Sequence, residues 1–283
     1  MDIALRKSIV EGTPYVSKLF REQQPLQLML KIFLSPNQLQ FLITDEHHTV
    51  LWLQPYECTE NNLSFLDDDL LDELTVSNEL LEKKFVTVSA GIFTSEFILA
   101  PELEASAEMK NFFRKQSVSP DEESEILQDQ IHELSAELIY AVPSPVMKAL
   151  AKMFETFSYQ HACAAQIRHL LPKNLGWNVY VVIQNGPFQI LVFSGHQLKF
   201  ANSFSFRTAE DFIYYIMAVY HSLELDPENI PVTVFGEILR DSALFQIMTK
   251  YIRDVKLGKA PELWKFEDDY PFPLHFYSSL LTL

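Results

Sequence analysis

The feature that most constrains this chain is a pattern of three strands that occurs twice, at an offset of about 150 residues. Each copy consists of three short apolar runs separated by polar turns, which predicts an antiparallel meander. The turn Asn185-Gly186 is the strongest short hairpin signal of the set. The runs are 26–34, 39–44 and 49–53 in the first copy, and 177–184, 187–193 and 197–206 in the second.

Each meander is followed by residues that predict a helix, a strand and a second helix. In the second copy, Thr208 with Asp211 predicts a start similar to a capping box, with Asp in place of the usual Glu or Gln, for a helix whose apolar residues follow helical spacing. The sequence therefore predicts an α/β protein of two duplicated lobes, each ordered βββαβα. We place the first lobe at residues 1–142 and the second at 143–283.

Composition narrows the class of partner. The chain of 283 residues is 48% hydrophobic and 21% charged, which is typical of a globular protein, and its formal net charge is −16. A nucleic-acid binder needs clustered cations, whereas basic residues here gather only in pairs: Arg6-Lys7, Lys83-Lys84 and Arg114-Lys115. We therefore expect neither nucleic acid nor an anionic membrane surface as a partner.

The cysteines and the hydropathy pattern indicate the compartment. Cys58 and Cys163 lie far apart in the sequence and form neither a disulfide framework nor a metal knuckle. No run approaches the 18 or so apolar residues that span a bilayer, and no signal-peptide core follows Met1. The expected location is the cytoplasm, with no insertion into a membrane.

Three short segments carry a family resemblance. They are Phe97-Ile98-Leu99-Ala100-Pro101, Leu138-Ile139-Tyr140-Ala141-Val142-Pro143 and Val232-Thr233-Val234-Phe235-Gly236-Glu237. The order of elements in the two lobes resembles the actin-like ATPase fold, a ribonuclease H-like fold shared by actin, sugar kinases, Hsp70 chaperones and pilus or secretion assembly proteins. The three segments indicate a narrower resemblance, from about residue 20 to the end, to an uncharacterised bacterial family assigned that fold.

The resemblance implies three features that hold a nucleotide in active members. In the first hairpin, an Asp binds Mg²⁺ through water and a Gly lets backbone N–H groups reach phosphate. A glycine-rich turn in the second lobe also binds phosphate, and a Gly-Gly turn after a later strand makes room for the adenine. Here the first hairpin turn reads Ser35-Pro36-Asn37-Gln38 and the second reads Gln184-Asn185-Gly186-Pro187. The turn that would admit the adenine has one glycine, Gly236, followed by Glu237. The acid and most of the glycines are missing, and prolines remove backbone donors.

We therefore expect a degenerate nucleotide cleft formed by Asn185, Gly186, Gly236 and Glu237, with no catalytic residue and no metal ligand. The favoured function is a non-catalytic interaction or scaffold protein with an unidentified protein partner and no cofactor. The alternative is a nucleotide-binding switch or ATPase that uses ATP with Mg²⁺ in the cleft between the lobes. Homo-oligomerisation is left open.

Other clusters of polar residues favour structural roles. The acids Asp67-Asp68-Asp69 and Asp72-Glu73 match no calcium loop and suit the first turn of a helix that Ser64 is expected to cap. His161, His169 and Cys163 fall near one helical face, without further metal ligands. His47-His48 is expected to be solvated in a turn.

Two segments are left with open interpretations. The polar stretch 116–125 is the best candidate for a linker. The end of the chain is rich in aromatic residues, which indicate either a final strand that closes the second lobe or an exposed patch for a partner. These aromatic residues are Trp264, Phe266, Tyr270, Phe272, Phe276 and Tyr277.

Overall fold

The computed structural model describes residues 9–21, 27–59, 63, 66–101, 107–116, 123–172, 174–267 and 273–283. Its strands are β1 (Ile9–Glu11), β2 (Tyr15–Val16), β3 (Met29–Ser35), β4 (Gln38–Thr44), β5 (Val50–Cys58), β6 (Thr87–Ile92), β7 (Phe97–Pro101), β8 (Ser124–Ile131), β9 (Ala136–Pro143), β10 (Ser158–His161), β11 (Trp177–Ile183), β12 (Pro187–Ser194), β13 (Gln197–Ser205), β14 (Val232–Gly236) and β15 (Val255–Leu257). Its helices are α1 (Lys18–Arg21), α2 (Asp68–Ser77), α3 (Ala107–Gln116), α4 (Ser144–Met153), α5 (Ala162–Leu170), α6 (Ala209–Ser222), α7 (Ala243–Tyr251) and α8 (Ser278–Leu281), with short 3-10 turns η2 (Glu79–Glu82), η3 (His132–Leu134) and η4 (Leu274–Tyr277).

Five strands follow the same order in two sheets, and the first sheet also has β1 and β2, both paired with β5. The first runs β1-β5-β4-β3-β6-β10, and the second runs β13-β12-β11-β14-β15. In each sheet the meander is antiparallel, and the strands added after it are parallel to the meander's first strand or to each other. The two predicted meanders therefore occupy equivalent places, β3-β4-β5 and β11-β12-β13.

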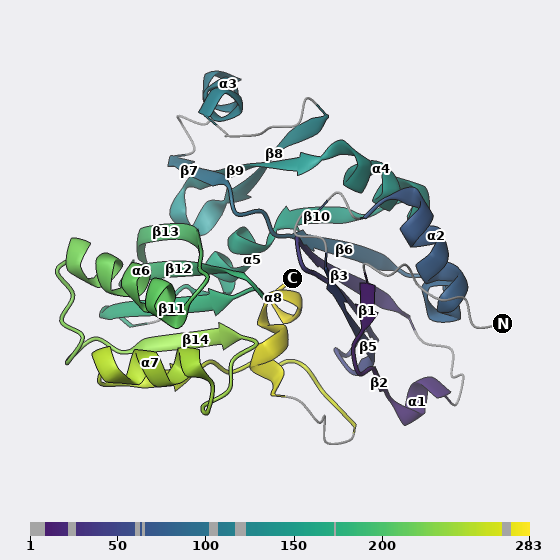
Figure 1. Cartoon of the computed structure of the whole chain (residues 1–283). Helices are drawn as coiled ribbons and strands as arrows, with labels where there is room; N and C mark the ends of the chain where they lie inside the picture. The colour runs from purple at the N-terminus through teal and green to yellow at the C-terminus, as the bar shows by residue number, and fades with distance from the viewer. Residues whose placement is uncertain are drawn as a thin grey trace.

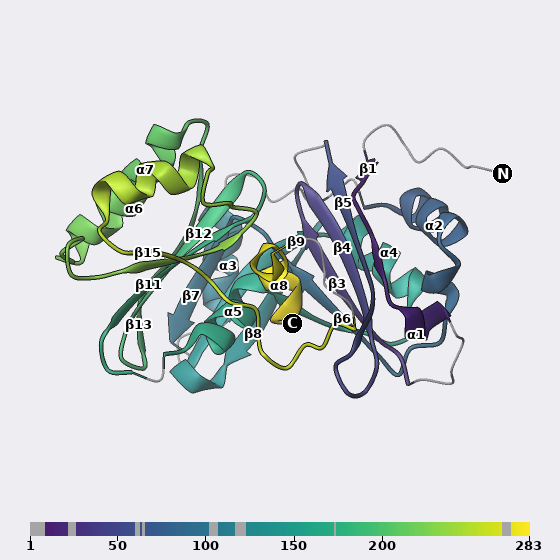
Figure 2. The same cartoon turned by 90° about the horizontal axis from the view of Figure 1, so that it is seen from below.

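The layers alternate helix and sheet (Figures 1 and 2). Helices α2 and α4 pack on one face of the first sheet, and α6 and α7 pack on the outer face of the second. Helices α5 and α8 lie between the two sheets and contact each other. Because β4 and β12 are covered on both faces, they are buried almost throughout, which explains their nearly continuous apolar sequences.

A third sheet is inserted into the first lobe. Its order is β7-β9-β8, and it lies in the connection between β6 and β10, which are neighbours in the first sheet. Among the elements expected after the first meander, the apolar runs 96–100 and 137–142 correspond to β7 and β9, and the helix expected at 102–115 corresponds to α3 from residue 107 on, since 102–106 lie outside the described residues. The sequence did not predict β8 or the separate sheet, because pairing between distant strands leaves no local pattern. Within the described residues, no helix is long and apolar enough to cross a bilayer.

The expected division at 142/143 coincides with the end of β9. Strand β10, at residues 158–161, nevertheless pairs with β6, so the first sheet continues past that division. The second sheet begins with β11 at Trp177, and α5 connects the two. The polar stretch 116–125 overlaps the start of β8, and residues 117–122 lie outside the described residues.

The predicted final strand is wrong, because the chain ends in helical turns. Strand β15 closes the second sheet beside β14, and the residues after it cross to the first lobe, where the Val50 N–H donates to the Lys265 carbonyl at 2.8 Å. The turn η4 and helix α8 then enter the space between the sheets, where Leu280 and Leu281 are buried. A helical turn satisfies part of its own backbone hydrogen bonding, so it can end the chain between the sheets without pairing to either of them.

The aromatic residues near the end of the chain differ in how deeply they are buried. Trp264 and Tyr277 are buried, and the Trp264 indole N–H donates to the Leu281 carbonyl at 2.9 Å. Phe266 and Phe276 are half-buried against the same cluster. Tyr270 and Phe272 lie outside the described residues. The exposed aromatic patch is therefore not found at Trp264 or Tyr277.

Candidate functional site

The turns of the two meanders meet between the lobes. The β3–β4 turn carries Asn37, whose side-chain amide donates to the Asn185 carbonyl in the β11–β12 turn at 2.6 Å. The Asn37 carbonyl in turn accepts the Cys58 N–H at 2.7 Å, which fixes the turn to β5. A Cβ atom at Gly186 would lie 2.9 Å from the Asn37 amide nitrogen. In this conformation the space between Asn37 and Gly186 is too small for a phosphate group.

A second contact between the lobes lies beside the first. The Gln38 amide, at the start of β4, donates to the Glu237 carboxylate after β14 at 2.7 Å. The pKa of Glu237 is raised, mainly by partial burial of its carboxyl group and also by the nearby Glu57 carboxylate, while the bond from Gln38 opposes that rise; because the residue as a whole is exposed, the effect of burial is small. Glu57 stands opposite Gln38 in the β4–β5 pairing. Two carboxylates at this position repel the phosphates of a nucleotide.

Gly236 is required by the backbone. Its φ is +93°, and a Cβ at this position would lie 2.0 Å from the Ile183 carbonyl oxygen. Ile183 is its partner in the β11–β14 pairing. The close approach of two strands therefore accounts for this glycine, without any need for a bound adenine.

Behind the turns lies a layer of buried amides and hydroxyls. The Ser279 hydroxyl of α8 accepts from the Gln166 amide of α5 at 2.7 Å and from the Gln184 amide at the end of β11 at 2.6 Å. All three residues are buried. One hydroxyl thus joins both central helices to the second lobe, and the network contains no formal charge.

The structure brings all four predicted site residues, Asn185, Gly186, Gly236 and Glu237, to one place. It adds Asn37 and Gln38 as their direct contacts, and the buried layer behind them. Gln40 and Gln189 also interrupt the apolar β4 and β12 at matching positions and are both buried, but the Gln189 side-chain amide has no hydrogen-bond partner among the described residues, so it is not part of the Ser279 network. Glutamines within a buried strand indicate a polar interior.

The other polar clusters have local structural roles. The helix expected to start near Ser64 starts instead at Asp68, where the Asp67 carboxylate caps it by accepting the Leu70 N–H at 2.9 Å. Ser64 lies outside the described residues. Within the part of the chain that the structure describes, no group of three or more His, Cys, Asp or Glu residues is placed to hold a metal ion.

His161 caps α5 rather than binding a ligand. Its Nδ1 accepts the Cys163 N–H at 3.1 Å, and the side chain is fully buried, which lowers its pKa to about 3. Burial raises the pKa of the Cys163 thiol, which is unfavourable for a nucleophile. The Asp129 carboxylate accepts the His161 N–H at 2.5 Å and so ties the inserted sheet to β10.

Comparison with known proteins fits this architecture. A family model described as "Protein of unknown function (DUF3822)" matches residues 18–255. The chain belongs to the DUF3822 family. No curated protein matches it.

This DUF3822 chain is similar to two solved structures. One is a protein from Bacteroides thetaiotaomicron with actin-like ATPase fold and unknown function, with a TM-score of 0.72 and 19% identity over 84% of this chain and 93% of that one. The other is the PilM-PilN type IV pilus biogenesis complex, with a TM-score of 0.59 and 12% identity over 91% of this chain and 98% of that one. The predicted actin-like fold and the predicted family resemblance are confirmed.

Proposed function

We propose that this DUF3822 protein is a non-catalytic partner-binding protein, in which the cleft between the lobes holds the lobes together instead of holding a nucleotide. The observation that carries the proposal is the hydrogen bond from the Asn37 amide to the Asn185 carbonyl. It joins the two turns that would otherwise cradle phosphate, and it leaves no room between them.

Charge supports the same conclusion. A triphosphate with its metal is recognised by backbone N–H groups, cations and a carboxylate on Mg²⁺. The side chains that form or adjoin the contacts at these turns include the amides of Asn37 and Gln38 and the carboxylates of Glu57 and Glu237. The carboxylates of this set would repel the negatively charged phosphates of a nucleotide.

A similar architecture occurs in an assembly of two proteins, the PilM-PilN complex. That likeness supports a role in which this fold binds a protein. The identity of 12% is too low to carry over the partner itself.

Thermal unfolding with and without ATP and Mg²⁺ tests the proposal. A site with a Kd of about 0.1 mM would stabilise the folded protein by about 2.3 kcal/mol at about 5 mM ATP, which is a shift of several degrees. We expect no shift and no phosphate release. A shift that Asn37→Ala enlarges by opening the turns would support the alternative nucleotide-binding switch.

A second measurement addresses the partner. The tagged full chain is purified from lysate of its native host, once with ATP removed enzymatically and once with ATP and Mg²⁺ added. The proposal expects one stoichiometric protein partner under both conditions. A partner that is released when ATP is added would contradict a nucleotide-independent role.

A further inference from the structure

Acidic residues are absent from one long stretch of this acidic chain. No Asp or Glu occurs between Glu155 and Glu210, although the whole chain has 38 of them and a formal net charge of −16. The same stretch contains Arg168, Lys173, Lys199 and Arg207. The charge is therefore strongly uneven along the sequence, and solubility alone does not require such unevenness.

This stretch ends in a strand with a free edge. Residues 156–209 form β10, α5, β11, β12 and β13, and β13 is the outermost strand of the second sheet. Within the described residues β13 pairs with β12 alone. The outer edge of such a strand presents backbone N–H and C=O groups that can pair with another strand.

Cations border this edge. Lys199 is exposed and sits at a bulge, because Leu198 pairs with Phe193 and Phe200 pairs with Val192, leaving Lys199 without an opposite residue on β12. Arg207 is exposed just beyond the strand. Together they place one cation near each end of β13, and at the far end Arg207 lies beside Glu210 and Asp211 in the first turn of α6.

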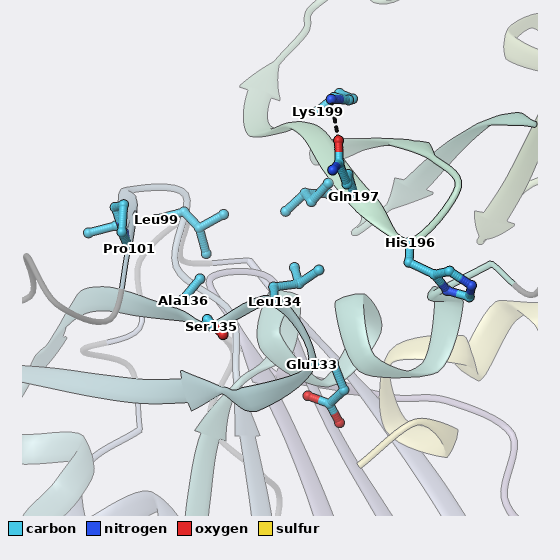
Figure 3. Close-up of a pocket in the computed structure, with 11 residues that line it drawn as sticks. Leu99, Pro101, Glu133, Leu134, Ser135, Ala136, His196, Gln197 and Lys199 are labelled. Carbon is cyan, nitrogen blue, oxygen red and sulfur yellow. Dashed lines mark hydrogen bonds between the residues drawn. The ribbon is translucent and has the colours of Figure 1, made fainter. Parts of the chain in front are cut away.

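A groove with an apolar wall runs beside the start of β13 (Figure 3). It has a volume of about 500 Å³ and separates the β12–β13 turn and first residues of β13 from the inserted sheet. Leu99 and Leu134 point into the space, whereas the side chain of Glu133, the acid on that wall, points away from it. Leu198 lines the opposite side.

The other face of β13 is aromatic. Phe200 and Phe204 are half-buried and stack at 6.3 Å, and Phe204 stacks on Tyr215 of α6 at 4.7 Å. Tyr214, next to it, is 68% exposed. A strand added to this edge would meet apolar groups on both faces of the sheet.

We propose that the free edge of β13 binds an extended acidic segment of a protein partner as an added strand. Alternate side chains of such a segment would pack into the groove and against the aromatic face, and its carboxylates would meet Lys199 and Arg207. Because charges are screened beyond about 8 Å at physiological salt, Lys199 and Arg207 weigh more in the match than the net charge of the chain, and Glu210 and Asp211 oppose Arg207 at its end of the strand. The inference rests on the proposed partner-binding function and names the surface that serves it.

Fluorescence anisotropy with two synthetic decapeptides tests the proposal. One alternates Val with Glu and the other alternates Val with Lys, and each is titrated with the full chain. The first should bind at least about tenfold more tightly than the second and should weaken as NaCl is raised. The double variant Lys199→Glu, Arg207→Glu should lose about tenfold in affinity for the acidic peptide.

A matched control keeps the total charge equal. The double variant Lys84→Glu, Lys148→Glu changes the net charge by the same amount, at exposed positions of the first lobe. It should leave the affinity within about twofold, since these charges lie far from the edge. Circular dichroism confirms that both variants are folded.

Hydrogen exchange locates the binding. The acidic peptide should protect the amides of residues 197–206 and leave those of α2 unchanged. Protection elsewhere, equal binding of both peptides, or equal loss in the two double variants would overturn the proposal. So would a dimer of the chain alone that Lys199→Glu, Arg207→Glu abolishes, because the edge would then pair with a second copy.

The outcomes separate this inference from the proposed function. If the native partner binds the Lys199→Glu, Arg207→Glu variant as well as it binds the unchanged chain, partner binding stands and the β13 surface is wrong. If the acidic peptide binds as expected but ATP stabilises the protein and is hydrolysed, the surface stands and the non-catalytic function is wrong.

Discussion

The buried hydroxyl of Ser279 gives the sharpest test of how the lobes are held together. This residue of α8 accepts hydrogen bonds from the Gln166 and Gln184 amides at 2.7 and 2.6 Å. Its neighbour Ser278 is equally buried, at 5% exposure for each, but the Ser278 hydroxyl has no hydrogen-bond partner among the described residues. The two serines therefore form a matched pair in one helix.

The expected effects follow from the partners. Ser279→Ala leaves two buried amide donors without this acceptor, at about 1–3 kcal/mol each, so we expect a loss of about 2–6 kcal/mol in the free energy of unfolding. Ser278→Ala removes a hydroxyl that forms no hydrogen bond within the described residues, so we expect the free energy of unfolding to change by no more than about 0.5 kcal/mol. The helix propensity gained from alanine is the same at both positions and cancels in the comparison.

Urea unfolding, followed by tryptophan fluorescence and by circular dichroism, measures both variants. The transition midpoint of Ser279→Ala should fall well below that of Ser278→Ala, with unchanged slopes. Equal midpoints for the two variants would refute the conclusion that the Ser279 hydroxyl joins α5, α8 and the second lobe.

Three further outcomes are expected. Gly236→Ala should lower the free energy of unfolding by about 2–3 kcal/mol or more, because its φ is +93° and its Cβ would lie 2.0 Å from the Ile183 oxygen. The control Gly195→Ala should cost only about 1 kcal/mol, because its Cβ would lie 3.7 Å from its nearest described neighbour. Chemical denaturation measures both variants. The His161 ring should be neutral at pH 5 when its state is measured by NMR, because its pKa is about 6.5 in the unfolded chain and about 3 in the folded protein. As the pH falls through that range, the unfolded chain binds the proton first. Protonation of His161 therefore lowers the free energy of unfolding by up to about 1.4 kcal/mol per pH unit. In a Cys58→Ser background, the buried Cys163 thiol should react with iodoacetamide at pH 8 only as fast as the protein opens, and rapid labelling of the native state would contradict its raised pKa.

Much of the fold follows from local patterns in the sequence. The two meanders correspond to β3-β4-β5 and β11-β12-β13, since alternation, turn residues and Asn-Gly act over a few residues. The capping box of Thr208 and Asp211 is present at α6 for the same reason. The four residues of the expected cleft also converge, because the order of strands in each lobe places their turns at matching sites.

What the sequence did not determine depends on contacts between distant residues. The pairing of β10 with β6, the separate sheet of β7, β8 and β9, and the helical end of the chain are set by which surfaces remain uncovered after the sheets form. Gly236 illustrates the limit: the sequence suggested a remnant of an adenine turn, and the structure shows that a neighbouring carbonyl requires the glycine. The sequence by itself thus determined the two meanders and the helix that follows the second, because these depend on short-range backbone and hydrophobic preferences. Only the tertiary structure decided that the turns of the two lobes bind each other, because a hydrogen bond between Asn37 and Asn185 has no trace in either local sequence.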